Sequence, residues 1–347
     1  AWREPLRHAL DALRDATAAL FERHGATLLH DPWEARDAYV DVVTRPDDAE
    51  VLRDFLRQHL RPRCSDAERV TAVTLLEAQR NAMAMYTSCA WFFADLTGIE
   101  TVQNLRYAAR CIELMRDISG EDLEGPFLEL LTQAHSNNGH DSGRSIYENW
   151  VRPDVRTAEH AVTARALLGA LDLAAGARSF YSFTVESEEE ATLVLAGHCG
   201  RQGRLQLLER RTGRGGEFTY LVLQYAPRLF ACFVALADRS KHEQIRRELS
   251  RLRADLTRVE LERILSGLYA SRPRGIPDLL PQERRHIATT MATERVAAMR
   301  VHARAVFDES QELLRDFAEV GLELPEELRI PCELSMQADV DAAAAAL

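Results

Sequence analysis

The spacing of apolar residues changes in the middle of the chain, and this change constrains the fold more than any other feature. Up to Gly176, apolar residues recur every three to four positions, which is the spacing of one helix face. Residues 177–237 instead form short β-branched or aromatic segments. Helical spacing returns at Asp238. We therefore predict an α+β fold, mainly α, in which a small antiparallel sheet is inserted between an N-terminal helical bundle (1–176) and long C-terminal helices (238–347) that pack back on the first part.

About four or five strands are predicted in the central region. Arg214-Gly215-Gly216 is typical of a hairpin turn, and Thr212–Gly216 lacks the Gly-Lys-Ser/Thr that a phosphate-binding loop requires. We interpret the acidic run Glu188–Glu190 as a solvated turn. The predicted strands are 179–186, 191–197, 203–211, 217–225 and 229–236.

Local signals mark several helix ends. Ser65-Asp66-Ala67-Glu68 has the residues of a capping box and predicts the start of a helix. Asp31, followed by Pro32, predicts another helix start. Gly25 is expected to end the first helix, and Gly98 to separate two later ones.

The charge balance argues against two classes of partner. The net charge is −11, whereas nucleic acids and anionic membranes attract surfaces with a local basic excess. We also see no apolar run long enough to span a membrane and no signal peptide, so we expect a cytoplasmic protein. The chain begins at Ala1 without a methionine, which we interpret as methionine removal or as the start of a piece of a longer protein.

Metal and cofactor chemistry are not predicted. His135, His140 and Asp141 flank a polar loop, but histidines five residues apart on such a loop have no set ligand geometry. The cysteines are far apart and lack metal-ligand spacing, so we expect reduced, buried thiols. These cysteines are Cys64, Cys89, Cys111, Cys199, Cys232 and Cys332.

The segment Glu77–Thr101 is the main candidate for function. It combines aromatic residues with carboxylates, an amide and a guanidinium, as sugar-binding sites do: aromatic faces cover the C–H surfaces of sugar rings while polar groups bond the hydroxyls. Aromatic residues at helical spacing are more often core residues, however, and the charges could form internal ion pairs. The residue types alone favour a buried core.

A family resemblance changes this balance. Met85–Phe93, Gly98–Gln103 and Leu105–Arg110 resemble the signature of domain of unknown function 3536. Shorter matches to this family extend almost from end to end of the chain. They are Trp2–Arg7, Asp31–Trp33, Ser136-Asn137, Tyr147-Glu148, Val151–Pro153, Leu279–Pro281 and Glu283–Arg285.

The resemblance implies an accessory role beside a catalytic domain. This family typically follows the barrel of a family 57-type glycoside hydrolase, which would carry both catalytic carboxylates and which no part of this chain resembles. Related helical regions lend aromatic residues to the sugar cleft, often from a Ser-Asp-Trp segment. In Ser88–Phe93 Asp is absent beside Trp91, and Ala90 stands where Gly is usual. The implied partners are the barrel, in the same polypeptide or as a separate fragment, and an oligosaccharide or α-glucan.

We therefore predict a substrate-shaping element that carries no catalytic residue, so that the isolated chain is inactive on glucans. One alternative is a non-catalytic structural or protein-interaction module with a buried aromatic core. Another is an independent enzyme that uses Glu77 and Asp95 as an acid–base pair in one open cleft. The candidate substrate-binding residues are Trp91, Tyr86, Phe92, Phe93, Glu77, Gln79, Arg80, Asp95 and Glu100.

Overall fold

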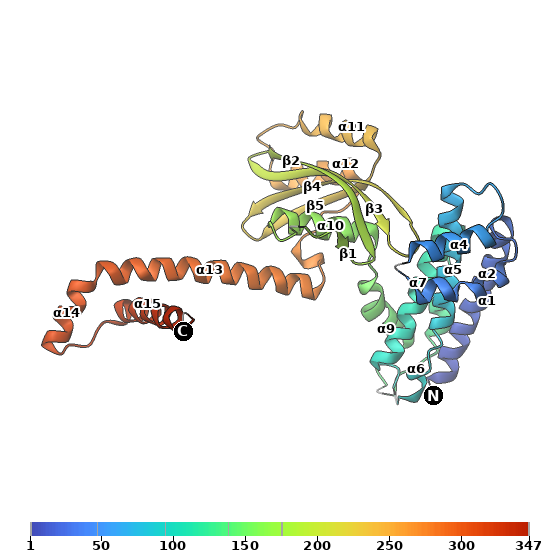
Figure 1. The fold of residues 1–347 in the computed structure, drawn as a ribbon, viewed down its shortest axis with the longest axis horizontal. Coiled ribbons are helices and arrows are strands. Elements are labelled where there is room, and N and C mark those ends of the chain that lie inside the picture. The colour runs from blue at the N-terminus through green and yellow to red at the C-terminus, as the bar shows by residue number, and fades with distance from the viewer. Residues whose placement is uncertain (1, 47, 94, 138, 175, 346–347) are drawn as a thin grey trace.

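The computed structural model confirms the α+β, mainly α, fold class. It describes residues 2–46, 48–93, 95–137, 139–174 and 176–345. A helical bundle lies at one end, a five-stranded sheet covered by helices lies in the middle, and a pair of long helices projects at the other end (Figure 1).

The bundle is built around three long helices that contact one another, α1 (Arg3–Leu28), α5 (Asp66–Ala84) and α7 (Ile99–Ser119), and a shorter helix, α8 (Glu124–Leu131), which packs on α1. Their apolar faces form one core, which includes Trp2 at the start of the chain. Shorter elements surround them. These are α2 (Pro32–Ala38), α3 (Val40–Thr44), α4 (Ala49–His59), α6 (Cys89–Phe92), α9 (Gly143–Ile146), a π-helical turn (Tyr147–Val151) and a 3-10 turn (Arg152–Asp154).

The predicted helix starts are confirmed, whereas one predicted end is wrong. The backbone N–H of Ser65 donates to Glu68, and Ser65 Oγ accepts from the Glu68 backbone, so the capping box opens α5. The Asp31 side chain caps α2 by accepting from the backbone N–H groups of Trp33 and Glu34. The first helix does not end at Gly25 but continues to Leu28. A Cβ on Gly25 would lie 3.1 Å from Pro32 Cβ, so the glycine serves the close approach of α1 and α2.

The sheet is an antiparallel meander in the order β1-β2-β3-β4-β5. Its strands are β1 (Ser179–Phe180), β2 (Phe183–Leu195), β3 (His198–Glu209), β4 (Gly215–Ala226) and β5 (Leu229–Leu236). The predicted hairpin turn at Arg214 is confirmed, because β3 and β4 pair directly on either side of it. The two predicted strands 179–186 and 191–197 are in fact mostly one strand, β2.

The acidic run Glu188–Glu190 lies inside β2, so its interpretation as a turn was wrong. The Tyr220 hydroxyl is 2.8 Å from Glu188 Oε1 and 2.7 Å from Glu190 Oε2. Arg165 also pairs with Glu188 at 2.7 Å. Glu188 and Glu190 are therefore paired with residues of other elements, whereas the Glu189 side chain is 69% exposed.

Helices cover both faces of the sheet. Helix α10 (Ala158–Ala170) lies on one face, and α11 (Arg239–Leu249) and α12 (Arg258–Tyr269) lie on the other (Figure 1). Successive residues of β4 point to opposite faces: Tyr220 and Val222 join the core cluster of α10, while Leu221 and Leu223 join that of α11 and α12. Helix α10 falls in the region 1–176 that we assigned to the bundle, but it packs on the sheet.

The last part of the chain does not pack back on the bundle as expected. A 3-10 turn (Ile276–Asp278) leads into α13 (Pro281–Glu309), followed by α14 (Gln311–Val320) and α15 (Glu326–Ala345). Helix α13 leaves the sheet, and α15 packs against the part of α13 that is farther from the sheet, as Figure 1 shows.

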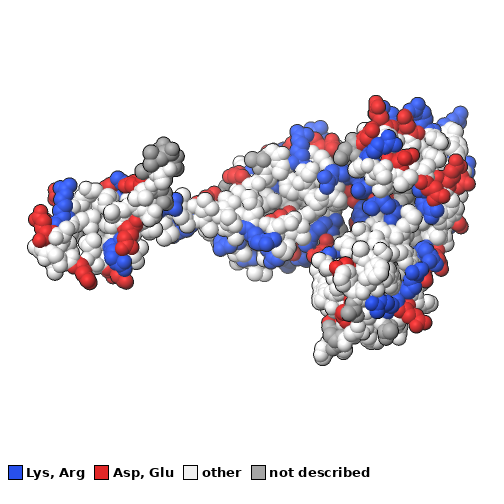
Figure 2. Space-filling model, turned by 60° about the horizontal axis from the view of Figure 1, so that its bottom comes forward, with Lys and Arg blue, Asp and Glu red and all other residues white. Residues whose placement is uncertain are grey.

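The surface carries charges of both signs. Acidic and basic side chains are mixed over the face shown in Figure 2. Within the described residues, no helix is long and apolar enough to cross a membrane. Cys89 and Cys199 are exposed, contrary to our expectation of buried thiols, whereas Cys111, Cys232 and Cys332 are buried.

Candidate functional site

The structure divides the predicted site residues between two places. Glu77, Gln79 and Arg80 lie on the inner part of α5, whereas the aromatic residues follow the end of this helix at Ala84. The α-helical rise of about 1.5 Å per residue separates the two groups along the bundle. They therefore do not form one pocket.

Glu77 belongs to the interior of the protein. Its side chain is only 3% exposed and accepts a hydrogen bond from the Tyr39 hydroxyl at 3.0 Å. Arg80 pairs with it at 2.8 Å, and Arg211 approaches to 3.7 Å. Burial and the neighbouring Glu77 carboxylate raise the pKa of Tyr39. Because Glu77 does not face an open cleft, the acid–base pair of Glu77 and Asp95 is not formed.

Gln79 is also buried, and its side-chain amide donates to the backbone oxygen of Thr17 at 3.4 Å. Arg80 is held beside Glu77 by their ion pair. A buried carboxylate that already has a hydroxyl and a guanidinium as partners stabilises the packing of α5. For these residues the contacts match a role in the core.

Trp91 lines an open hollow at the end of the bundle. Its ring stacks on the buried Trp2, with 6.3 Å between ring centroids and 16° between ring planes. Arg3 Nε donates to the backbone oxygen of Trp91 at 3.0 Å. The hollow has a volume of about 740 Å³, and we call it the Trp91 hollow. Its lining residues are Arg3, Glu4, Pro5, Arg7, His8, Asp11, Trp91 and Gln133.

Tyr86 supports one wall of this hollow. Its hydroxyl donates to Asp11 Oδ1 at 2.6 Å, and the Arg7 guanidinium lies 4.8 Å above the Tyr86 ring. The burial of Asp11 opposes its ionisation, but the bond from Tyr86 and the charges of Arg14 and Arg7 outweigh it and lower its pKa. The hollow is therefore lined by an ionised carboxylate and by the Trp91 ring, groups that suit sugar hydroxyls and C–H faces.

The other aromatic residues point outward. Phe92 is 81% exposed and Phe93 is 48% exposed, and neither lines the Trp91 hollow. Glu100 is half-buried in the first turn of α7.

Asp95 holds a loop in place. Its carboxylate accepts from the backbone N–H and the hydroxyl of Thr97 at 2.8 and 2.7 Å. The Ser136 hydroxyl and the Asn137 N–H, each at 2.7 Å, bind it from the neighbouring loop. Burial acts to raise the pKa of Asp95, but these donors dominate and lower it to about 2. Asp95 thus joins two loops beside α6.

Replacing Asp95 by Asn should make the stability of the chain less sensitive to acid. A carboxyl group with a lowered pKa stabilises the fold fully above its unfolded pKa, and this contribution is lost as the pH falls through the folded pKa. For Asp95 this contribution is lost as the pH falls from the ordinary pKa of 3.8 to the lowered pKa of about 2. Urea midpoints should therefore fall less steeply with acid in Asp95→Asn than in the wild type. The exposed Asp66, replaced by Asn, serves as the control; identical slopes for all three proteins would contradict the prediction.

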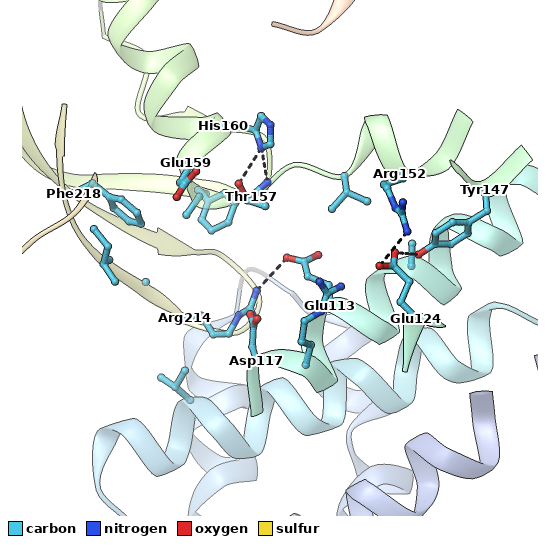
Figure 3. A pocket seen from close by; sticks show the side chains of 18 residues that line it. Glu113, Asp117, Glu124, Tyr147, Arg152, Thr157, Glu159, His160, Arg214 and Phe218 are labelled. Carbon is cyan, nitrogen blue, oxygen red and sulfur yellow. Dashed lines mark hydrogen bonds and ion pairs between the residues drawn. The ribbon is translucent and has the colours of Figure 1, made fainter. Parts of the chain in front are cut away.

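A second, larger cavity of about 1040 Å³ lies where the bundle meets the sheet, and we call it the joint cavity. Helices α7 and α8, the start of α10 and the β3–β4 turn surround it (Figure 3). Its residues are spread from 70 to 236, so no local pattern could have revealed it. The lining residues are Val70, Ala109, Glu113, Arg116, Asp117, Glu124, Tyr147, Arg152, Val155, Thr157, Ala158, Glu159, His160, Phe183, Arg214, Gly215, Phe218 and Leu236.

Among the described residues, no cluster of three or more His, Cys, Asp or Glu side chains has a metal-binding arrangement. The loop between His135 and Asp141 is closed by backbone pairing, with Ser136 N donating to the Asp141 oxygen at 2.8 Å. Asn138 of this loop lies outside the described residues.

Comparison with known proteins yields a family. No curated protein and no solved structure matches the chain. A family model described as a domain of unknown function, DUF3536, matches residues 1–280, which include the bundle, the sheet and its covering helices. The match ends next to the start of α13. The chain therefore belongs to the DUF3536 family of domains of unknown function.

Proposed function

We propose that this chain is the accessory region of a family 57-type glycoside hydrolase and that the Trp91 hollow contacts an α-glucan or oligosaccharide. The observation that carries the proposal is the position of Trp91. The indole is half-buried and supported by Trp2, and it faces a hollow that Glu4, Arg7 and Asp11 also line. A rigid aromatic surface beside hydrogen-bonding side chains is the arrangement that binds sugar rings.

In this proposal the catalytic carboxylates lie on a separate barrel, where a glycosidase positions its carboxylate pair about 5–9.5 Å apart. Glu77 and Asp95 cannot serve as that pair, because Glu77 is buried and Asp95 is held by its loop. The chain would shape the sugar site, and hydrolysis or transfer would take place on the partner. Turnover of an α-glucan by the purified chain would contradict this division of roles.

Replacing Trp91 by Ala should weaken the binding of maltohexaose about tenfold, because truncating a central aromatic contact typically costs more than about 1 kcal/mol. We would titrate the ¹⁵N-labelled chain and follow its indole N–H signals. The indole signal that disappears in Trp91→Phe is assigned to Trp91. In the wild type this signal should shift when maltohexaose is added.

Trp150 provides the matched control. It is 44% exposed and does not line the Trp91 hollow, so Trp150→Ala should bind maltohexaose as the wild type does. If the Trp91 signal stayed fixed at saturating maltohexaose, or if both Ala variants bound equally well, the proposed sugar contact would be wrong.

A protein-interaction module is the second candidate, and the exposed side chains near α6 favour it. Phe92 and Ile99 are 81% and 74% exposed, and exposed apolar residues that cluster often mark a docking surface. This alternative placed Trp91 and Tyr86 in a buried aromatic core, but both side chains are only half-buried and pack against that core. Phe92 distinguishes the two candidates. Docking of a partner would depend on its side chain, whereas sugar binding in the Trp91 hollow would not, because Phe92 does not line that hollow.

A further inference from the structure

We infer that the joint cavity is a second binding site for a neutral oligosaccharide, which an α-glucan chain would occupy. The inference rests on the proposed function for its ligand class, but it concerns different residues and can fail separately. Cavities between packed subdomains are common ligand sites, and this one is walled by the bundle on one side and by α10 and the β3–β4 turn on the other (Figure 3).

Six of the seven charged side chains that line the cavity form ion pairs within the described residues, so the cavity does not call for a strongly charged ligand; the seventh is Arg116. Glu124 pairs with Arg152 at 3.3 Å, and Glu113 with Arg214 at 3.6 Å. Arg214 also pairs with Asp117. A ligand that brought a net charge would disrupt these pairs or leave its own charge unbalanced.

Glu159 and His160, which also line the cavity, add little net charge. Glu159 is neutralised from outside the cavity by Arg274, at 2.5 Å. Burial and the nearby Arg274 and Arg156 lower the pKa of His160 to about 4, so its imidazole is neutral at neutral pH. The lining thus offers polar atoms with little net charge.

Hydroxyl groups match these polar atoms because each can both donate and accept. A carboxylate has about four lone-pair positions, and the Glu124 carboxylate has the Tyr147 hydroxyl at 3.1 Å and Arg152 as partners. Glu124 can therefore accept further hydroxyl hydrogens, while the N–H groups of Arg116 and Arg152 can donate to hydroxyl oxygens. Adjacent acceptors and donors of this kind suit the neighbouring hydroxyls of a sugar ring.

The cavity also offers apolar contact for the C–H face of a sugar. Leu236 at the end of β5 is 63% exposed although it lines the cavity, and Val70 and Val155 are half-buried. At about 1040 Å³ the cavity is as large as the upper end of the usual range for small-molecule sites, about 300–1,000 Å³. This size favours a chain of several sugar units over a single ring.

Two reporters in one titration test the inference. With leucine methyl groups and tryptophan indoles labelled, maltohexaose should shift the Leu236 methyl signals as well as the Trp91 indole signal. Leu229, 41% exposed on the same strand and absent from the cavity lining, should not shift. The double variant Arg116→Ala/Arg152→Ala should weaken binding about tenfold at the Leu236 reporter and leave the affinity at the Trp91 reporter unchanged.

The matched control is Arg23→Ala/Arg57→Ala, which removes two exposed arginines outside the cavity and should leave both affinities unchanged. If Trp91 shifts and Leu236 does not, the joint cavity is no sugar site and the proposed function stands. If Leu236 shifts and Trp91 does not, the joint cavity is supported and the Trp91 hollow is rejected. Equal affinities of the two double variants at Leu236 would overturn the inference.

Discussion

Replacing Glu209 by Ala should destabilise the chain by about 3–5 kcal/mol, the usual cost of removing one partner of a buried ion pair. The Glu209 side chain is 1% exposed and lies at the end of β3. It pairs with Arg110 of α7, with Arg214 at 3.1 Å and with the Thr212 hydroxyl at 2.7 Å. Without the carboxylate, two guanidinium groups that are each less than a third exposed would lose a main partner.

The control for this change is Glu217→Ala, measured by urea unfolding under the same conditions. Glu217 lies on the neighbouring strand, is 42% exposed and pairs with Arg204, and exposed pairs contribute at most about 1 kcal/mol. A further variant, Glu209→Ala/Arg110→Ala, should recover part of the lost stability because it removes one of the unpaired charges. A loss below about 1 kcal/mol for Glu209→Ala would show that the network does not hold the sheet to the bundle.

The ion pairs of Glu209 also hold one wall of the joint cavity in position. Arg214 and Glu113 line the cavity, and Arg214 also binds Glu209 behind it. Loss of Glu209 should therefore free the β3–β4 turn, which hydrogen exchange of the backbone from 209 to 216 would detect as faster exchange than in Glu217→Ala.

Local patterns predicted the elements of this fold but not their partners. The capping box at Ser65 and the hairpin turn at Arg214 depend on residues within a few positions, and both were predicted from the sequence. Glu188–Glu190 looked like a turn because its partners, Tyr220 and Arg165, come from another strand and a helix. No sequence spacing encodes such contacts.

The candidate site shows the same limit. The sequence grouped Glu77 with Trp91 because both lie in one segment, but Tyr39 and Arg80 satisfy Glu77 in the interior. Trp2, which supports Trp91, lies 89 positions earlier in the chain and was singled out only as part of a family motif. The joint cavity was missed altogether, since its walls come from many elements that lie far apart in the sequence.

Replacing Trp2 by Ala should have the second large effect, a loss of about 3–5 kcal/mol, as is usual when a buried aromatic residue is truncated to Ala. Trp2 is 1% exposed, belongs to the core of the bundle and stacks against Trp91. Trp2→Phe keeps an aromatic ring and should lose less stability. Trp150→Ala, at a 44% exposed position, should change the free energy of unfolding by less than about 1 kcal/mol.

Trp2 also links stability to the proposed sugar contact. The Trp91 ring has Trp2 on one side, so its orientation depends on a residue that does not line the Trp91 hollow. Under conditions in which Trp2→Phe remains folded, maltohexaose should bind more weakly than to the wild type, and the Trp91 indole signal should be broadened, because a smaller ring leaves the indole free to reorient. Unchanged affinity and an unchanged Trp91 signal in folded Trp2→Phe would mean that Trp2 serves only the core and that the stacked pair does not preorganise the hollow.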